Sequence, residues 1–438
     1  MWAQLVMIRR IDGSLAWRFM AIFFAVATLS ACMSTQRNAA VPVEARNFVK
    51  ILGLTNARFY TDQIDEITQE QTKAIIREAH YKGIQKGGTI PKTYGLTLSG
   101  GADNGAFGAG LLVGWSKHGD RPPFKLVTGI STGALIAPFA FLGSKYDDKL
   151  TDVYTTLDKS KVYRERLLPV AAIAQDALND TDPLYYTISS YLDDQVLSEI
   201  AAEYQKGRLL VIQTTDLDAG RPVLWNIGAI AASGHPDSLN LIRKILLASA
   251  AIPAAFPPVL FDVEINGDIR QELHVDGGAV SQSFLAPAKL NINRALSLSG
   301  YKHEGFGVYV IRNGRLHTEW SEVDRKTLTI AQRAVTVLTN YSGLNDLYKM
   351  YLIAKRSGTH FRLAYIPDDY DGKHEEEFDQ NYMNGLFNYA YDKAAKGYPW
   401  DTAPLDLVTK KTENIIHLNI QACLNLSMFR DKNSQLNR

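Results

Sequence analysis

The sequence predicts an α/β protein in which helices cover both faces of a mainly parallel sheet. Short apolar runs that end in glycine are each followed by a helical pattern, over residues 93–119 and again over residues 124–143. Such alternation of strand, tight turn and helix is typical of parallel βαβ units. The chain of 438 residues is 46% hydrophobic and 21% charged, a composition that suits a globular protein with a large core. We therefore expect a three-layer α/β/α architecture.

Charge and cysteine content argue against several other classes of protein. The 47 Lys and Arg residues nearly balance the 46 Asp and Glu residues, so the formal charge of +1 gives no basic field for nucleic acid. The two cysteines, Cys32 and Cys423, are too few for a disulfide framework or a cysteine-built zinc site. No motif requires a metal ion or another cofactor, and nothing in the sequence indicates the oligomeric state.

The N-terminus has the pattern of an export signal. Three arginines within the first 18 residues precede an apolar run of about 11 residues over 19–29. This run is too short to span a bilayer comfortably, although a buried helix or a retained membrane anchor are the alternatives.

The residues that follow, Leu-Ser-Ala-Cys at 29–32, resemble the lipobox of bacterial lipoproteins. The resemblance implies acylation of Cys32 and removal of residues 1–31 as a signal peptide. Two or more acyl chains on one cysteine give a stable anchor. We expect a lipid-anchored protein of the bacterial cell envelope. An Asp directly after the cysteine would resemble the inner-membrane retention signal, so Met33 at this position favours the outer membrane, facing the periplasm.

The predicted elements divide the chain into four parts. A tether and helical N-terminal extension over 32–92, with a helical pattern at 47–87, follows the signal. The core spans 93–367, and a C-terminal helical cap spans 368–438. Further strands are predicted at 208–217, 221–228, 273–278, 307–314 and 360–367, and helices at 239–252, 326–355 (one long helix or a pair) and 378–396.

A G-x-S-x-G motif, Gly129-Ile-Ser131-Thr-Gly133, lies where an apolar strand meets a helix. A serine at such a sharp turn is held with its hydroxyl exposed, and the flanking glycines allow neighbouring segments to approach. The following helix directs its positive end at developing negative charge. The alternative is a plain helix start with Ser131 as its N-cap.

A glycine-rich loop over residues 99–108, SGGADNGAFG, also joins a strand to a helix. Such a loop presents backbone N–H groups to an anion, either a phosphate or the oxyanion of acyl transfer. The spacing departs from G-x-G-x-x-G, and no Lys-Ser/Thr ending of a phosphate-binding loop follows. A third element, Asp276-Gly277-Gly278, ends a predicted strand, where an Asp could reach a serine on a neighbouring element. An isolated Asp-Gly is otherwise most often a turn.

The chain resembles the patatin-like phospholipase family over about residues 95–278. Four ordered motifs carry the resemblance: the loop at 99–105, G-x-S-x-G at 129–133, the block ASAAIPAAFPP at 248–258 and Asp-Gly-Gly at 276–278. The resemblance implies a patatin-like fold and cleavage of carboxylic esters, with fatty-acyl, phospholipid or lysophospholipid esters as the substrate class.

The resemblance also implies a Ser–Asp dyad that needs neither histidine nor metal. Ser131 would attack the ester carbonyl, and Asp276 would take the hydroxyl proton and pass it to the leaving alcohol. The tetrahedral oxyanion would be held by backbone N–H groups around Gly100, Gly101 and Ala102, with that of Thr132.

Two positions depart from the family pattern. Ala102 replaces the third glycine of the loop, and Asn104 stands before Gly105 where a basic residue is common. Ala102 could still donate its N–H at negative φ. The neighbouring Asp103 would oppose a developing oxyanion unless its carboxylate points away, so we expect it to face solvent or a basic partner.

A histidine is the rival for the base, because an α/β-hydrolase triad runs Ser, Asp or Glu, then His. His303 or a later histidine could complete such a triad, and His274 would share a strand face with Asp276. The rival of another class is a non-catalytic envelope lipoprotein that keeps the fold as a binding or scaffolding module. We expect a lipid or ester substrate, contact with the membrane through Cys32, and no nucleic acid partner.

Overall fold

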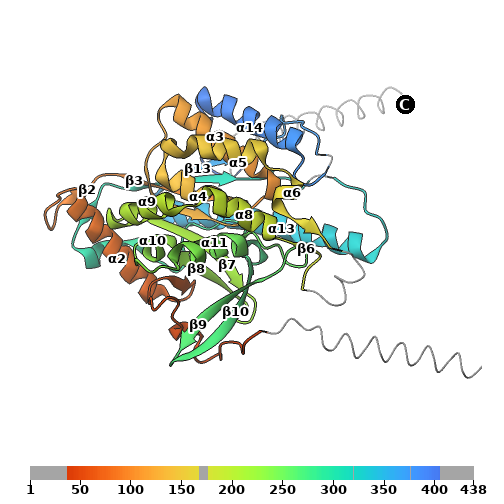
Figure 1. The fold of residues 1–438 in the computed structure, drawn as a ribbon. Coiled ribbons are helices and arrows are strands. Elements are labelled where there is room, and N and C mark those ends of the chain that lie inside the picture. Colours follow the sequence, from red (N-terminus) through yellow and green to blue (C-terminus); the bar gives the residue numbers. More distant parts are fainter. Residues whose placement is uncertain (1–36, 167–175, 319, 375, 405–438) are drawn as a thin grey trace, which may run out of the picture.

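The computed structural model describes residues 37–404 except 167–175, 319 and 375. Within this part of the chain, one nine-stranded sheet organises the molecule (Figure 1). Its strands are β1 (Arg58–Tyr60), β3 (Thr93–Leu98), β4 (Phe124–Gly129), β7 (Leu209–Asp216), β8 (Arg221–Asn226), β9 (Val259–Ile265), β10 (Asp268–Asp276), β12 (Phe306–Arg312) and β13 (His360–Tyr365). Two small sheets pair β2 (Thr89–Ile90) with β11 (Lys302–His303), and β5 (Arg164–Glu165) with β6 (Asn179–Asp180).

The strand order β1-β8-β7-β4-β3-β12-β13 places the predicted βαβ units at the centre of the sheet. The five strands from β7 to β13 are parallel to one another, as predicted for the core. Strands β8 and β1 extend the sheet antiparallel, and β10 with β9 forms an antiparallel hairpin that joins β7.

Helices lie on both faces of this sheet, so the predicted three-layer α/β/α class is confirmed (Figure 1). The helices are α2 (Ile64–Tyr81), α3 (Gly105–His118), α4 (Thr132–Leu142), α5 (Asp147–Thr156), α6 (Lys159–Val162), α8 (Asp182–Tyr191), α9 (Asp194–Gln205), α10 (Ile227–Ala231), α11 (Ser238–Ser249), α12 (Ile292–Ser299), α13 (Thr327–Arg356) and α14 (Gln380–Ala395). Short 3₁₀ turns are η1 (Arg46–Phe48), η2 (Ala102–Asn104), η3 (Ser144–Tyr146) and η4 (Gly277–Ala279).

Alternating strand residues divide the core between the two faces. On one face, Leu98, Val127 and Ile212 join the large cluster formed with α3, α4, α11 and α14. On the other face, Val308 and Val310 of β12 pack under α13. Almost all of these side chains are withdrawn from water, so the central strands are covered on both sides, as a parallel sheet requires.

The N-terminal region departs from the helix predicted over residues 47–87. A left-handed turn at Leu52 and Gly53, with φ of 51° and 71°, interrupts the helical pattern. Residues 58–60, Arg-Phe-Tyr, instead form β1 and pair with β8, so the edge of the sheet overrides the local helical pattern. Only the part from Ile64 to Tyr81 is an α-helix, and the two-residue strand β2 follows it.

The other predicted elements match the structure to within a few residues. Residues 326–355 form one helix, not a pair, and residues 378–396 contain α14. Helix α14 packs so closely on α3 that a β-carbon on Gly110 would come within 2.3 Å of the Phe387 backbone oxygen. A β-carbon on Gly114 would come equally close to the Tyr391 backbone oxygen. No helix in the described ranges is both long and apolar enough to cross a membrane.

The arrangement of β4 and β10 decides where the site lies. Both strands pair with the same edge of β7: Gly129, the last residue of β4, is opposite Ile212, and Asp276, the last residue of β10, is opposite Thr214. Because β4 runs parallel and β10 antiparallel to β7, the C-terminal ends of β4 and β10 face each other along this edge. The chain that follows β4 and the end of β10 are therefore brought together from 147 residues apart in sequence (Gly129 to Asp276).

Candidate active site

Ser131 occupies the sharp turn between β4 and α4, as the G-x-S-x-G motif predicts. Its backbone has φ 54° and ψ −127°, a conformation that non-glycine residues rarely adopt and that is found mostly at functional sites. The flanking glycines are required by close contact. A β-carbon on Gly129 would lie 2.4 Å from the carbonyl oxygen of Gly133, and one on Gly133 would lie 2.4 Å from that of Leu98.

The backbone of this turn is fixed by Ser249, at the end of α11. The Ser131 N–H donates to Ser249 Oγ at 3.0 Å, and the Ser249 hydroxyl donates to the Gln213 carbonyl oxygen on β7 at 2.8 Å. Ser249 is completely buried. It belongs to the block at 248–258 noted in the sequence, so the structure gives that motif a physical role: it ties the nucleophile turn to β7.

Asp276 lies beside Ser131, and the Ser131 hydroxyl favours the charged form of its carboxylate. Asp276 Oδ1 accepts the N–H of Gly278 at 2.7 Å, which acts in the same direction. Burial outweighs both and raises the pKa of Asp276 from its ordinary 3.8 to about 7. A carboxylate with a pKa near neutrality is suited to accept and return a proton.

Gly277 and Gly278 allow the chain to turn directly after this carboxylate. A β-carbon on Gly277 would lie 2.6 Å from the Gln213 carbonyl oxygen, and one on Gly278 would lie 3.0 Å from Asp276 Oδ1. The Gln213 side-chain amide donates to the Gly277 carbonyl oxygen at 3.2 Å. The Asp-Gly-Gly motif is thus a fixed turn whose geometry positions the carboxylate.

The glycine-rich loop passes next to Ser131. A β-carbon on Gly100 would lie 3.3 Å from Ser131 Cβ, and one on Gly101 would lie 2.0 Å from the Asn313 carbonyl oxygen. The Gly100 N–H donates to the Gln282 carbonyl oxygen at 3.0 Å, so it is not available to an oxyanion. This corrects the expectation that Gly100 is a donor: its part is to let the loop approach Ser131.

Three of the expected donors remain unused. Within the described part of the chain, no hydrogen bond is made by the N–H groups of Gly101, Ala102 or Thr132. The negative φ expected for Ala102 is wrong, because its φ is 50°, a left-handed conformation that glycine would adopt without strain. The Ala102 N–H is nevertheless unused in this conformation. Gly105 packs on Thr132, because a β-carbon there would lie 2.1 Å from Thr132 Oγ1.

The Asp103 carboxylate contacts a basic partner, as predicted. Its Oδ2 lies 2.5 Å from His374 Nε2 and accepts the Phe378 N–H at 2.9 Å. The hydrogen bond to Asp103 raises the pKa of His374. The neighbouring Asn104 accepts a hydrogen bond from the Tyr382 hydroxyl at 2.6 Å. The glycine-rich loop is therefore held by His374, Phe378 and Tyr382.

Asn313, which the sequence analysis did not single out, also holds the same loop. Its side chain donates to the Ser99 carbonyl oxygen at 2.8 Å and accepts the Gly108 N–H at 3.0 Å. Its own N–H donates to Ser99 Oγ at 2.8 Å. The available signal was its place directly after a parallel strand, at the edge where sites form. Gln282, which holds Gly100 and Gly278, had no comparable signal.

The rival base is not found at Ser131. Among the histidines in the described ranges, none hydrogen-bonds Ser131, and His417 lies outside those ranges. His274 is completely buried, with Nδ1 2.8 Å from Thr214 Oγ1 and Nε2 3.2 Å from Glu272 Oε2. His303 lies 3.0 Å from Thr93 Oγ1.

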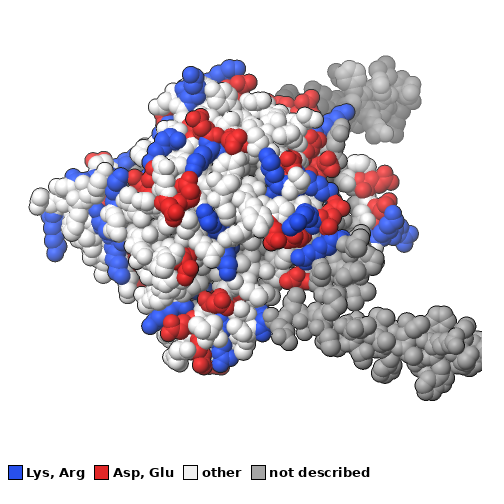
Figure 2. Space-filling view, in the orientation of Figure 1, with Lys and Arg blue, Asp and Glu red and all other residues white. Residues whose placement is uncertain are grey.

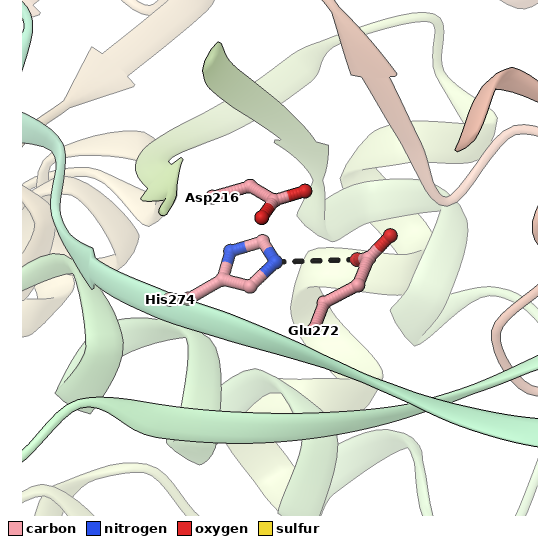
Figure 3. Close-up of side chains that lie close together, drawn as sticks. All are labelled: Asp216, Glu272 and His274. Carbon is pink, nitrogen blue, oxygen red and sulfur yellow. Dashed lines mark hydrogen bonds and ion pairs between the residues drawn. The ribbon is translucent and has the colours of Figure 1, made fainter. Parts of the chain in front are cut away.

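His274 belongs to a buried cluster with Asp216 and Glu272, whose ligand atoms lie within 4.8 Å of one another (Figure 3). The residues do not fit a metal site, because protein groups already occupy their ligand atoms. Arg58 binds both oxygens of Glu272 at 2.5 and 2.7 Å. The Tyr60 hydroxyl donates to Asp216 Oδ2 at 2.8 Å. A cation would have to displace the Arg58 guanidinium, so the cluster is structural.

The predicted lipidation residue Cys32, with residues 1–31, and Cys423 lie outside the described residues. On the face shown in Figure 2, positive and negative side chains are interspersed, with no field of a single sign.

Comparison with known proteins agrees with the geometry of the site. The model of the patatin-like phospholipase family matches residues 96–289, which contain both Ser131 and Asp276. No curated protein matches the chain. Among solved structures, the crystal structure of VipD from Legionella pneumophila is similar at 11% sequence identity and a TM-score of 0.31, over 70% of this chain and 67% of that one. Residues 96–289 of the chain therefore form a patatin-like phospholipase domain.

Proposed function

We propose that the chain is a serine acyl hydrolase that cleaves fatty-acyl esters through an acyl-serine intermediate, with Ser131 and Asp276 as its dyad. One observation carries the proposal. The hydroxyl at the strained Ser131 turn lies beside a buried carboxylate, that of Asp276, whose pKa is raised to about 7. A nucleophile in contact with a base of that pKa is the arrangement that acyl transfer needs.

In the first half of the reaction, Ser131 Oγ attacks the ester carbonyl carbon while Asp276 takes the hydroxyl proton. The carbonyl oxygen becomes an oxyanion, which the unused N–H groups of Gly101, Ala102 and Thr132 bind. Helix α4 begins at Thr132 and directs its positive end at the same charge. Collapse of this intermediate breaks the ester C–O bond, and the leaving alcohol takes the proton from Asp276.

In the second half, a water molecule attacks the acyl-serine and gives its proton to Asp276. The second tetrahedral intermediate expels Ser131 Oγ, which recovers that proton, and the fatty acid leaves. A single carboxylate serves as base and then acid in both halves. Such a group needs a pKa near the working pH, and burial gives Asp276 such a pKa.

We place the acyl chain in an apolar pocket that begins one helical turn from the nucleophile. Leu135 lies one turn beyond Ser131 on α4, and Leu246 lies three residues before Ser249 on α11. The Tyr154 hydroxyl at the pocket wall donates to the Thr132 carbonyl oxygen at 3.2 Å. The other lining residues are Pro138, Phe139, Val153, Leu157, Leu184, Thr187, Ile188, Tyr191 and Leu192. An apolar pocket beside the nucleophile favours long-chain acyl esters over small polar esters.

Turnover assays test the proposal. The purified protein is offered a chromogenic short-chain ester, a phospholipid and a lysophospholipid, with Ser131→Ala as the matched control. We expect release of acid or alcohol by the wild type and none above background by the variant. Failure of the wild type to hydrolyse any of the three would favour the rival function, a non-catalytic envelope module that keeps the fold for binding.

We further propose that Cys32 is acylated and holds the protein at the outer membrane, facing the periplasm. The support is the apolar run at 19–29 followed by Leu-Ser-Ala-Cys. Cys32→Ser is expected to block processing or to move the protein to the soluble fraction. Wild-type protein found soluble, with residues 1–31 still attached by mass spectrometry, would contradict the anchor.

A further inference from the structure

Helix α13 changes the direction of its apolar face halfway along its length. In its C-terminal half, Leu347, Met350 and Ala354 are buried against β12 and β13. In its N-terminal half, the large apolar residues form a stripe on the other side of the helix. At 100° per residue, the stripe lies about 180° around the axis from the buried side. We call these four residues the outer stripe: Ile330, Val335, Leu338 and Tyr341.

The outer stripe is exposed to solvent. Its members keep 52%, 58%, 70% and 59% of their surface accessible, and no residue between 327 and 342 whose side chain the structure describes is buried. Trp320, in the loop before the helix, is 86% exposed. The side of the helix opposite the stripe carries Gln332 and Thr336, so this half is amphipathic with its apolar side turned outward. Such a contiguous exposed apolar surface marks an interaction site.

The exposed half projects from the edge of the sheet that carries the dyad. Helix α13 connects the end of β12 to the start of the parallel strand β13, so its N-terminus lies at the edge where β3 and β4 also end. At 1.5 Å per residue the 30-residue helix is about 45 Å long, about twice the length of seven-residue β12. Since the C-terminal half covers the strands, the N-terminal half overhangs the catalytic edge (Figure 1).

Just beyond the overhang, at Asp346, helix α13 is joined directly to the active-site loops. Asp346 Oδ2 accepts the N–H groups of Gln282 and Ser283 at 2.7 and 3.2 Å. Gln282 in turn accepts the Gly100 N–H on its carbonyl oxygen and donates its side-chain amide to the Gly278 carbonyl oxygen at 2.9 Å. Gln282 therefore links helix α13 to Gly100 and Gly278, which lie next to Ser131 and Asp276.

We propose that the N-terminal half of α13, residues 327–341, is a lipid-docking surface that inserts its outer stripe into the interfacial region of a phospholipid bilayer. This inference rests on the proposed function, because it takes a bilayer lipid as the substrate that must reach Ser131. An amphipathic helix of this kind lies in the interfacial plane, and exposed Trp and Tyr are the residues that favour that depth.

The charges near the stripe favour insertion by apolar contact over attraction to anionic lipid. Arg325 and Lys326 precede the helix, and Arg333 lies within its N-terminal half. Glu322 and Asp324 stand beside the first two, and Lys326 pairs with Asp324 at 3.0 Å. With these charges nearly balanced, we expect binding to neutral bilayers, with little loss at high ionic strength.

The first test compares two substrates for one variant. Ile330→Gln, Val335→Gln and Leu338→Gln are combined, which removes the apolar surface and keeps a good helix former at each position. We expect hydrolysis of phosphatidylcholine vesicles to fall at least tenfold while hydrolysis of a soluble short-chain ester stays within twofold. The matched control, Gln332→Ser with Thr336→Ser on the other side of the helix, should change neither rate. Unchanged vesicle hydrolysis in the triple variant would overturn the proposal.

A second measurement does not depend on catalysis. An environment-sensitive fluorophore is attached through Leu338→Cys in a Ser131→Ala, Cys423→Ser background, and the same background with Leu338 unchanged is the labelling control. Neutral phosphatidylcholine vesicles should shift its emission to the blue, and spin-labelled lipids should quench it. If the wild type hydrolyses neither substrate but the label inserts, the proposed function fails and the lipid-docking surface stands. The lipid-docking surface is rejected if the label stays in water. It is also rejected if light scattering shows that a second copy of the chain covers the outer stripe.

Discussion

Strand β10 carries two buried carboxylates four residues apart, and they differ in what surrounds them. Glu272 is bound on both oxygens by Arg58 and lies 3.2 Å from His274 (Figure 3). Burial alone would raise the pKa of Glu272, but Arg58 and His274 hold it below the ordinary value. Asp276 has no cationic hydrogen-bond partner among the described residues, and burial raises its pKa to about 7.

Under the proposed function, the difference separates a structural charge at Glu272 from a reactive one at Asp276. A carboxylate that a guanidinium already neutralises has no use for a proton at neutral pH, so Glu272 can only hold β10 against β1. A carboxylate that accepts one backbone N–H and lies beside one hydroxyl keeps a proton affinity that acid–base catalysis can use. Residue type and burial are nearly the same at the two positions, so the counter-ion is what differs. The comparison predicts that substitutions at the two positions will affect different quantities.

The largest expected effect is on catalysis at Asp276. Ser131→Ala and Asp276→Asn should each lower kcat/KM by about 10³–10⁴-fold without unfolding the chain, and the double variant should be little worse, because the residues act as a unit. Initial rates with a soluble ester, and circular dichroism to verify folding, measure this. Substantial activity in Asp276→Asn together with its loss in one histidine variant would replace the dyad by a triad.

Glu272→Gln should affect stability instead. Removing one partner of a buried ion pair leaves Arg58 uncompensated, which typically costs about 3–5 kcal/mol of the free energy of unfolding. The folded fraction should keep its activity within a few-fold. Urea denaturation and active-site titration separate the two quantities. A stable but inactive Glu272→Gln protein would show that the counter-ion does not distinguish the two centres.

The same comparison predicts that Asp276→Asn stabilises the protein at alkaline pH. A carboxyl whose pKa is raised from 3.8 to about 7 on folding favours the folded state below pH 3.8, and this advantage is lost as the pH rises through 7. Above pH 7 the buried charge costs at most about 4 kcal/mol. Asn carries no such charge, so the melting temperature of the variant should exceed that of the wild type at pH 8, and the difference should shrink at pH 5. A constant difference would contradict the assigned pKa.

The pH dependence of the rate should report the same group. The base must be unprotonated in the free enzyme, so kcat/KM should rise with pH to a plateau, with a midpoint near 7. Below the midpoint, each pH unit should cost about tenfold. A soluble ester assayed from pH 5 to 8 is the measurement. A midpoint near 4 would indicate a solvated carboxylate in the active enzyme.

The smallest expected effect is at the contact between His374 and the glycine-rich loop. The hydrogen bond to Asp103 raises the pKa of His374, and nearby Asp379 and Glu377 act in the same direction. The ion pair between His374 and Asp103 is therefore fully present below the ordinary pKa of histidine. It is lost as the pH rises through the raised pKa of His374. His374→Ala should lower kcat a few-fold at pH 7 and by less at pH 9. His374→Lys, which keeps a cation, is the matched control and should restore part of the rate at pH 9.

Sequence patterns predicted the centre of the sheet, the strand-to-helix turn that carries Ser131 and the strand end that carries Asp276. Apolar runs bounded by glycine fix the buried strands, and the motif glycines mark places where a side chain would overlap backbone. Strand β1 could not be predicted in the same way. Its three residues are stable as a strand only because β8 and Glu272 lie beside them, which no local pattern reports.

The supporting residues of the site were hidden for a similar reason. Gln282, Asn313 and His374 act through contacts across 182, 214 and 271 residues of sequence, to Gly100, Ser99 and Asp103. An isolated Gln, Asn or His has many uses, so its type says little without its neighbours. The assignment of Gly100 as a donor was wrong because the Gln282 carbonyl oxygen occupies its N–H.

The bond between Arg58 and Glu272 also has a consequence for the order of folding. The two residues are separated by 214 positions, and β1 pairs with a strand that is synthesised more than 150 residues after it. Contacts that close such long loops form slowly, because the chain must lose the conformational entropy of the loop before the contact contributes favourable free energy. We expect β1 to join the sheet after β7, β8 and β10 have assembled. Until then the guanidinium that will balance Glu272 remains in water, and the N-terminal segment stays extended while the rest of the chain condenses.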